Sequence, residues 1–176
     1  VGEYTYCLEY ESNFWDDVQV KQYDAAGREK ILEELPEDKK ILIPCDYGLL
    51  VYCDKEGDLL YLIDQEGSVR ELFSFSCMDS ESTVNVYGDY AYLSFKRFEK
   101  WSDDGKDLVR YENDTLEGTW RIRLSDGTAE KISDSIYNGI YIFDDTGMYV
   151  CDRDCNIYKL DFSGKVIQVL LEHRFK

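Results

Sequence analysis

The sequence predicts an all-β protein made of repeated units of four short antiparallel strands. Three features predict it: segments that alternate apolar and polar residues, tight turns that contain glycine, and internal similarity between distant segments. Aromatic residues make up 15% of the 176 residues, and such side chains fit pleated, half-buried surfaces. Short strands joined by short turns leave no room for the crossover helices of a parallel sheet.

The clearest repeat joins two segments, one from Ile41 (ILIPCDYGLLVYCDKEGDLLYLIDQEGSVRELF) and one from Ile140 (IYIFDDTGMYVCDRDCNIYKLDFSGKVIQVLL). Each starts with an apolar strand and turns at an Asp-x-Gly, at residues 46–48 and 145–147. Each then continues through a second strand, a polar turn, a third strand, a turn that ends in glycine and a last strand. Both segments are therefore expected to form a four-stranded meander.

The other two units fit the same frame less closely. The third starts at Val84 (VNVYGDYAYLSF), makes a long excursion and resumes with TWRIRLSDGTAEKIS. The first starts with YTYCLEY and lacks its innermost strand, because only residues 1–3 precede it. Residues 28–35 could form one helical turn, but their place after Gly27 matches an outer strand, and we expect a strand there.

Four glycines mark the last turn of each unit: Gly27, Gly67, Gly127 and Gly164. They lie 40, 60 and 37 residues apart, nearly regular once the insertion in the third unit is removed. A tight hairpin needs a positive φ, which glycine adopts without steric cost.

Four strands at a period of about 40 residues are typical of a β-propeller blade. The expected architecture is a single propeller-like domain over residues 1–176, with units at about 1–39, 40–79, 80–135 and 136–176. Because the first unit lacks a strand, the chain holds about 3.75 blades, either an incomplete ring or a fragment of a larger one. The alternative is a β-sandwich or open meander, although sandwiches rarely repeat internally.

An incomplete ring would leave exposed sheet faces that normally stack on a neighbouring blade. The chain also begins at Val1 without a methionine, which indicates a processed, truncated or excised piece. We therefore expect either a homodimer formed through exposed blade faces or missing flanking sequence.

Three segments share an apolar strand that runs into an Asp-x-x-Gly turn: LLYLIDQEG (59–67), NIYKLDFSG (156–164) and, more loosely, QVKQYDAAG (19–27). This pattern resembles the bacterial propeller-like repeats related to those of low-density-lipoprotein receptors. The resemblance covers most of the chain but carries neither the tryptophan-aspartate signature of WD40 blades nor a clean Tyr-Trp-Thr-Asp. It implies a six- or seven-bladed propeller in the full protein, an extracytoplasmic or cell-surface setting, and an interaction role.

The formal net charge of −17 disfavours nucleic acid and anionic lipid as partners. No apolar run reaches the roughly 20 residues needed for a spanning helix, so no membrane insertion is expected. The six cysteines form no paired Cys-x-x-Cys motif, and their redox state stays open. No cofactor is predicted, because phosphate-binding loops, nucleophile elbows and zinc-hydrolase motifs are missing from the sequence.

Catalysis is not expected. The one histidine, His173, lies close to the C-terminus. Asp152, Asp154 and Asn156 have a spacing that could surround a calcium ion, but these residue types also cap hairpin turns, which is the preferred interpretation. The alternative to a binding module is a propeller enzyme that acts on carbohydrate through paired carboxylates, although 37 acidic residues identify no particular pair.

The insertion in the third unit, residues 95–118, carries five basic and four aromatic residues, among seven acidic ones. It is predicted to form a long hairpin, and residues 13–15 make a smaller counterpart in the first unit. Loops of this kind on a rigid scaffold often bind partners through Trp, Tyr and Arg, although these aromatics could equally cover the scaffold's own edge. The candidate binding residues are Phe14, Trp15, Lys96, Arg97, Phe98, Lys100, Trp101, Arg110 and Tyr111. The expected function is a non-catalytic protein- or ligand-binding or scaffold module.

Overall fold

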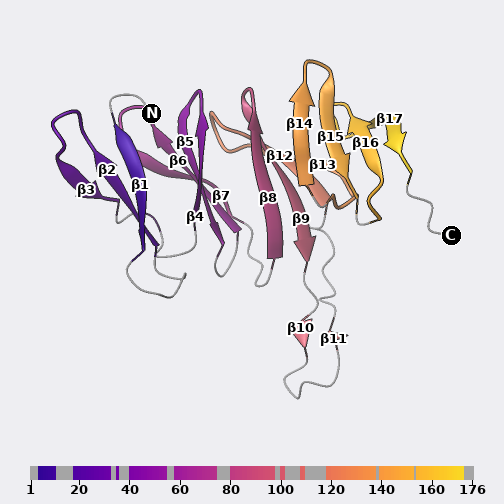
Figure 1. Ribbon diagram of the computed structural model, residues 1–176, viewed down its shortest axis with the longest axis horizontal. Coiled ribbons are helices and arrows are strands. Elements are labelled where there is room, and N and C mark those ends of the chain that lie inside the picture. The colour runs from indigo at the N-terminus through magenta and orange to yellow at the C-terminus, as the bar shows by residue number, and fades with distance from the viewer. Residues whose placement is uncertain are drawn as a thin grey trace. The chain divides into compact units, whose positions relative to one another are not determined.

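The computed structural model describes eleven segments of the chain, and every regular element in them is a β-strand (Figure 1). The described residues are 4–10, 18–32, 35, 40–54, 58–74, 80–97, 100–101, 108–109, 118–137, 139–152 and 154–172. Within these segments we find no long apolar helix of the kind that crosses a membrane. The all-β prediction is confirmed.

The first sheet has three strands in the order β1-β2-β3: β1 (Thr5–Tyr10), β2 (Val18–Tyr23) and β3 (Glu29–Ile31). The predicted lack of a fourth strand is therefore confirmed for the described residues. The ambiguous segment after Gly27 forms a strand at Glu29–Ile31, paired with β2 from Lys21↔Ile31 to Tyr23↔Glu29.

The second and fourth sheets are four-stranded antiparallel meanders, as their sequence similarity predicts. The second comprises β4 (Lys40–Cys45), β5 (Gly48–Asp54), β6 (Asp58–Asp64) and β7 (Val69–Ser74). The fourth comprises β14 (Gly139–Asp144), β15 (Gly147–Cys151), β16 (Ile157–Leu160) and β17 (Val166–Leu171). In each of these two sheets the strands pair in sequence order.

The third sheet has the order β13-β12-β9-β8, which places the insertion between its second and third strands. Its strands are β8 (Ser80–Tyr87), β9 (Tyr90–Arg97), β12 (Gly118–Arg123) and β13 (Ala129–Ser133). Within the insertion, β10 (Lys100–Trp101) pairs antiparallel with β11 (Leu108–Val109), as a hairpin requires.

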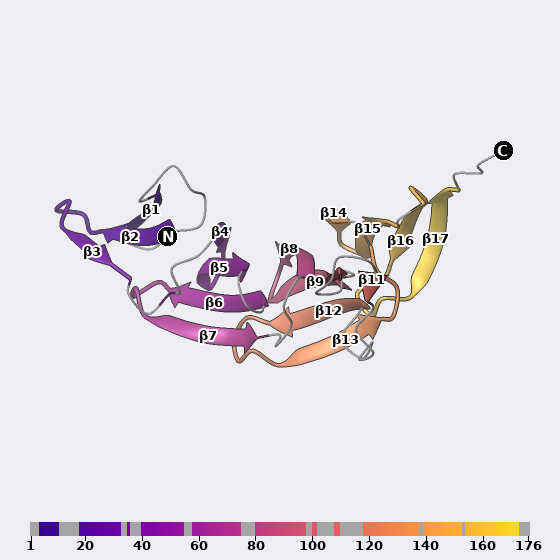
Figure 2. The ribbon, with the colours of Figure 1, turned by 90° about the horizontal axis from the view of Figure 1, so that it is seen from below.

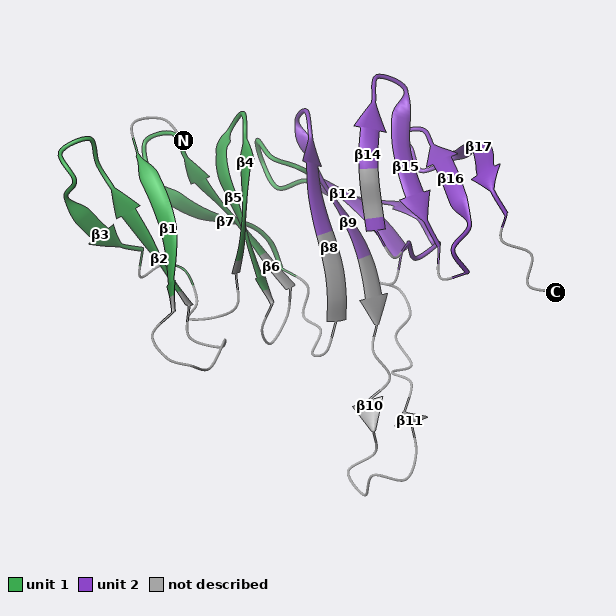
Figure 3. Ribbon diagram, viewed as in Figure 1, with its two compact units in different colours: residues 1–78, 123–128 green, residues 79–122, 129–176 purple. Residues whose placement is uncertain are grey.

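The chain divides into two compact units (Figure 3). Unit 1 comprises residues 1–78 and the turn 123–128, and unit 2 comprises residues 79–122 and 129–176. Each unit has its own core of buried strand residues. In unit 1 the core includes Val20, Leu49, Val51 and Ile63. In unit 2 it includes Tyr92, Met148, Val150 and Leu160.

Four antiparallel sheets of three or four strands thus follow one another along the chain. Among the described strands, no hydrogen-bonded pairing joins the first sheet to the fourth to close a ring. Whether residues 1–176 act as one domain stays a prediction.

Candidate interaction surface

The turn before each outer strand is organised by an aspartate. Asp24, Asp64 and Asp161 each accept, at Oδ1, the backbone N–H groups two and four residues later, at 2.9–3.0 Å. In each turn the N–H of the glycine three residues on donates to the aspartate carbonyl. The short aspartate side chain substitutes for a backbone acceptor, which is why this residue type recurs here.

The glycines of these turns have the conformation that the sequence predicts. Gly27, Gly67 and Gly164 have φ values of 75°, 85° and 84°. In the third sheet the turn is one residue longer: the N–H of Gly127 donates to the carbonyl of Arg123, and φ of Gly127 is again 75°. The left-handed conformation is common to all four turns and favours glycine.

The turn 123–128 seats its glycine against the outer strand of the second sheet, within unit 1. A Cβ built on Gly127 would collide with the carbonyl oxygen of Leu72 and lie 3.2 Å from its carbonyl carbon. Arg70, two residues earlier on β7, donates to the carbonyls of Leu124 at 2.6 Å and Ser125 at 2.8 Å. Glycine is therefore required at position 127 for close approach as well as for conformation.

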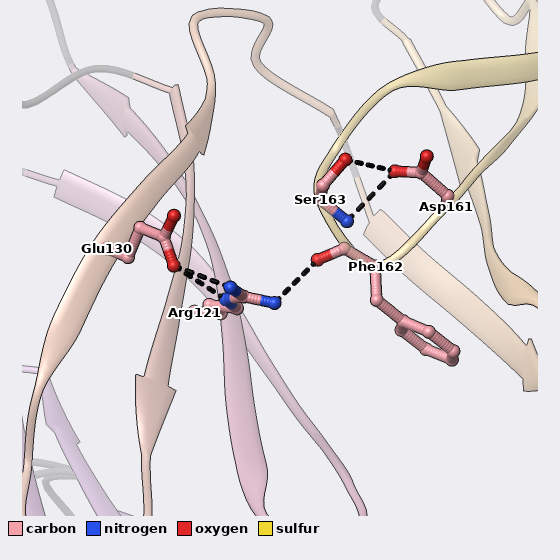
Figure 4. Close-up of polar contacts among 5 residues, drawn as sticks. All are labelled: Arg121, Glu130, Asp161, Phe162 and Ser163. Atoms are coloured by element: carbon pink, nitrogen blue, oxygen red, sulfur yellow. Dashed lines mark hydrogen bonds and ion pairs between the residues drawn. The ribbon is translucent and has the colours of Figure 1, made fainter.

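Unit 2 repeats this junction with different partners (Figure 4). A Cβ on Gly164 would collide with the carbonyl oxygen of Ile132, on outer strand β13. Arg121 of β12 donates to the carbonyl of Phe162 at 3.1 Å and forms two hydrogen bonds to Glu130 Oε2. In both junctions an arginine therefore holds the carbonyls of a turn against the outer strand of another sheet.

Aromatic stacking lies under the unit 2 junction. Tyr87 stacks on Phe143 and on Phe162, with centroid distances of 4.9 and 5.3 Å. Tyr92 packs against the same two rings and is 2% exposed. Burial of the Tyr92 hydroxyl raises its pKa to about 12, so it stays neutral across the physiological range. The turn residue Phe162 thus contributes apolar packing that Gly164, two residues later, cannot.

Between the first and second sheets, the turn glycine approaches a side chain of the other sheet and not its backbone. A Cβ on Gly67 would collide with the amide of Gln22, which is 6% exposed and donates to the hydroxyl of Tyr6 at 3.1 Å. Gly67, Gly127 and Gly164 therefore each press against a strand of another sheet.

The outer-strand residue that a turn glycine approaches is the extra residue of a β-bulge. On the third strands, Tyr61, Trp120 and Tyr158 pair with Glu71, Lys131 and Val169. A register shift lies immediately before each of these three third-strand residues. The extra residue is Leu72 in β7, Ile132 in β13 and Leu170 in β17. By register, Leu170 is thus the fourth-sheet counterpart of the residues that receive Gly127 and Gly164.

The counterpart in β17 is uncovered. Leu170 is 45% exposed, whereas Leu72 is 8% exposed. β17 is the last strand of the fourth sheet (Figure 2). All six of its residues are exposed, and five of them are large and apolar. Their exposed fractions are 45% for Val166, 49% for Ile167, 48% for Val169, 45% for Leu170 and 49% for Leu171. Contiguous apolar exposure on this scale is typical of a protein-binding surface.

Many acidic side chains of the described segments serve as turn caps or ion-pair partners, as Asp64 and Glu130 do. Where the pKa of one of these carboxyl groups shifts, it shifts downward, as it does for Asp24, Glu29, Asp126, Asp144, Asp152 and Asp161. At Asp144 the causes are the Lys159 ammonium at 2.5 Å, then Thr146 and Tyr149. A general acid of a glycosidase needs the opposite shift, so these residues give no support to paired-carboxylate catalysis.

Asp152 acts as a turn cap. Its Oδ1 accepts the N–H groups of Asp154 and Asn156, and its Oδ2 accepts the Asn156 amide at 2.8 Å and the Tyr158 hydroxyl at 3.1 Å. Partial burial raises the pKa of Asp152, but the hydrogen bonds lower it by more, so the pKa lies below its usual value. Four donors engage the carboxylate, as the turn-capping interpretation requires. Among the described residues, no group of three or more His, Cys, Asp or Glu side chains is placed to hold a metal ion.

The hairpin that the sequence marks for binding lies largely outside the described residues. Phe14, Trp15, Phe98, Arg110 and Tyr111 fall outside them, as does His173. Lys96 and Arg97 end β9, and Lys100 and Trp101 form β10, but only their backbone is described. Their role as binding residues stays a prediction.

Sequence reasoning missed the receiving side of the junctions. Arg70 and Arg121 look like ordinary charged strand residues in the sequence. A signal for β17 was present, however: VIQVLL has one polar residue and no charged one, whereas VRELFS of β7 has two charged residues. A strand that is apolar on both faces is expected to be covered on both.

No family model matches the chain, and a search of curated proteins finds no match.

Proposed function

We propose that the chain is a β-propeller-type, non-catalytic module that binds a protein partner through β17 on the fourth sheet. The repeated four-stranded sheets and the shared turn geometry support the propeller-type architecture. The observation that carries the function is the exposure of all six residues of β17, at a position that receives a turn in the second and third sheets.

The internal junctions indicate what such a partner must present. In both, the outer strand receives a tight turn whose glycine approaches the backbone of a bulged residue. The second residue of each of these turns is apolar. It is Leu124, which is fully buried, in one turn and Phe162, which stacks on Tyr87, in the other. A protein that carries a glycine-containing turn with an apolar residue fits the same surface on β17.

Site-specific photo-cross-linking tests this function. A photoreactive phenylalanine analogue replaces Ile167, which is 49% exposed on β17, and the control carries it at Ile142, which is 63% exposed on β14. After irradiation in an extract of the source cells, mass spectrometry identifies the cross-linked peptide of the partner. We expect adducts from position 167 that converge on one glycine-containing turn, and few from position 142. Equal or scattered adducts at both positions would refute the proposal.

A further inference from the structure

Among the four described turns that precede an outer strand, one lacks the contact with another sheet that the other three make. A Cβ built on Gly27 would meet nothing within 4 Å, whereas one on Gly67, Gly127 or Gly164 would collide with a residue of another sheet. The hydrogen bonds inside the turn 24–27 are otherwise those of the turns 64–67 and 161–164. The first turn is thus fully formed but uncovered.

The turn also presents a surface that suits an apolar strand. Ala25 and Ala26 are small, apolar and exposed. Ala25 directly follows the capping aspartate, as Phe162 does in the junction of unit 2. Asp24 and Arg28, the charged residues at the two ends of this turn, are paired with each other at 2.6 Å. Neither of these two side chains would therefore be buried as an unpaired charge.

The chain thus displays two unused halves of one recurring contact: the turn 24–27 in unit 1 and the strand β17 in unit 2. We propose that a second copy of this chain supplies the occupant of β17, with its turn 24–27 seated on the bulge at Leu170. The carbonyl of Leu170 would meet Gly27 of the other copy as the carbonyl of Leu72 meets Gly127. This inference rests on the proposed function, since it names the partner of the same surface.

Such an interface is heterologous, because different surfaces of the two copies meet. When one such junction forms between two copies, each copy still has one unused half. These two halves either bind each other, which gives a closed dimer with two identical junctions, or bind further copies, which gives a longer assembly. Burial of apolar area drives the contact. The formal net charge of −17 per copy opposes it, so association should strengthen as salt screens that repulsion.

Two variants separate the two halves. Gly27→Ala adds the Cβ that a seated turn cannot accommodate, and Leu170→Glu places a charge on the bulge. The control for the first is Gly88→Ala, since Gly88 has φ of 56° and equally open surroundings. The control for the second is Ile142→Glu, which adds the same charge to an exposed apolar position of the same sheet. Circular dichroism verifies that all four fold.

Sedimentation equilibrium of the whole chain is the measurement. We expect the unmodified chain to self-associate, more tightly at about 0.5 M than at about 0.05 M salt. Gly27→Ala and Leu170→Glu should each weaken association by about tenfold or more, which is the effect of losing about 1.4 kcal/mol, and the controls should not. Mixed in equal amounts, the two variants should form a one-to-one dimer, because each retains the half that the other lacks.

Two results would overturn the inference, and they differ in what they leave standing. If Leu170→Glu abolishes association but Gly27→Ala does not, β17 binds by another geometry, and the protein-binding role of β17 survives. If the unmodified chain stays monomeric at every concentration and salt, the second copy is not the partner, and the cross-linking experiment alone decides the proposed function.

Discussion

Leu72 and Leu170 occupy the same register position in two outer strands, and their surroundings differ. Each is the extra residue of a β-bulge, next to the point where a tyrosine of the third strand (Tyr61 or Tyr158) pairs with the outer strand. Leu72 is 8% exposed and lies against Gly127, whereas Leu170 is 45% exposed. The exposure of this position therefore depends on whether a turn of another sheet packs against it. The residue is leucine in both cases.

The largest test of that comparison is truncation of the two leucines. Leu72→Ala removes a buried side chain and should cost about 3 kcal/mol of unfolding free energy. Leu170→Ala should cost less than about 1 kcal/mol in the monomer, because its side chain already contacts water. Urea denaturation at low protein concentration measures both. Equal losses would mean that Leu170 is covered within the single chain.

Alanine at the turn glycines sharpens the comparison from the other side. Gly164→Ala combines backbone strain at φ of 84° with a collision against Ile132, and should cost about 3 kcal/mol. Gly27→Ala has only the strain, about 1 kcal/mol. Thermal denaturation of the two variants isolates the contribution of the junction. A loss at Gly27 as large as that at Gly164 would show that the turn 24–27 is already seated in the monomer.

The arginines test how much the polar half of a junction contributes. Arg121→Ala removes the hydrogen bond to Phe162 and the pair with Glu130, and should cost about 1–2 kcal/mol. Arg123→Ala removes a more exposed pair with Asp126 and should cost less than about 0.5 kcal/mol. Chemical denaturation at two salt concentrations compares them. A loss that disappears at high salt would assign the effect of Arg121 to Glu130 alone.

The smallest expected effect concerns a turn in which a residue other than glycine has a positive φ. Cys155 has φ of 61° and takes the place of glycine in the turn after Asp152, where its N–H donates to the Asp152 carbonyl. Cys155→Gly should therefore stabilise the chain by about 0.5–1 kcal/mol. Its melting temperature, compared with that of Cys155→Ala, checks this. Equal melting temperatures of the two variants would mean that the left-handed conformation at position 155 has no cost that glycine relieves.

The strands and turns could be predicted because their causes are local. Alternation marks the strands, and an aspartate three residues before a glycine marks three of the four turns before outer strands, at Asp24, Asp64 and Asp161. The junctions could not be predicted, because Arg70 meets Leu124 and Arg121 meets Phe162 across long stretches of sequence. Cys155 was hidden for another reason: a left-handed residue other than glycine has no compositional signature.

Exposed sheet faces were expected of an incomplete ring, but sequence analysis did not single out β17 as one of them. Five large apolar residues in six predict burial on both faces, and only the structure places them in contact with water. The hairpin at residues 95–118 is the reverse case, since its composition predicts a binding role that the described backbone of β10 and β11 neither supports nor opposes.

The aspartate caps have a consequence for how the chain behaves in mild acid. A carboxyl group whose pKa is lowered by folding stabilises the fold above its ordinary pKa, and that stabilisation fades only as the pH falls through the lowered value. Asp24, Asp144 and Asp161 are of this kind, so their turns should outlast the loss of net charge near the isoelectric point of about 4.4. In that interval the chain is folded yet without the repulsion that keeps it dispersed. Turbidity should therefore peak there while the circular dichroism spectrum is unchanged, and precipitation would be of native molecules.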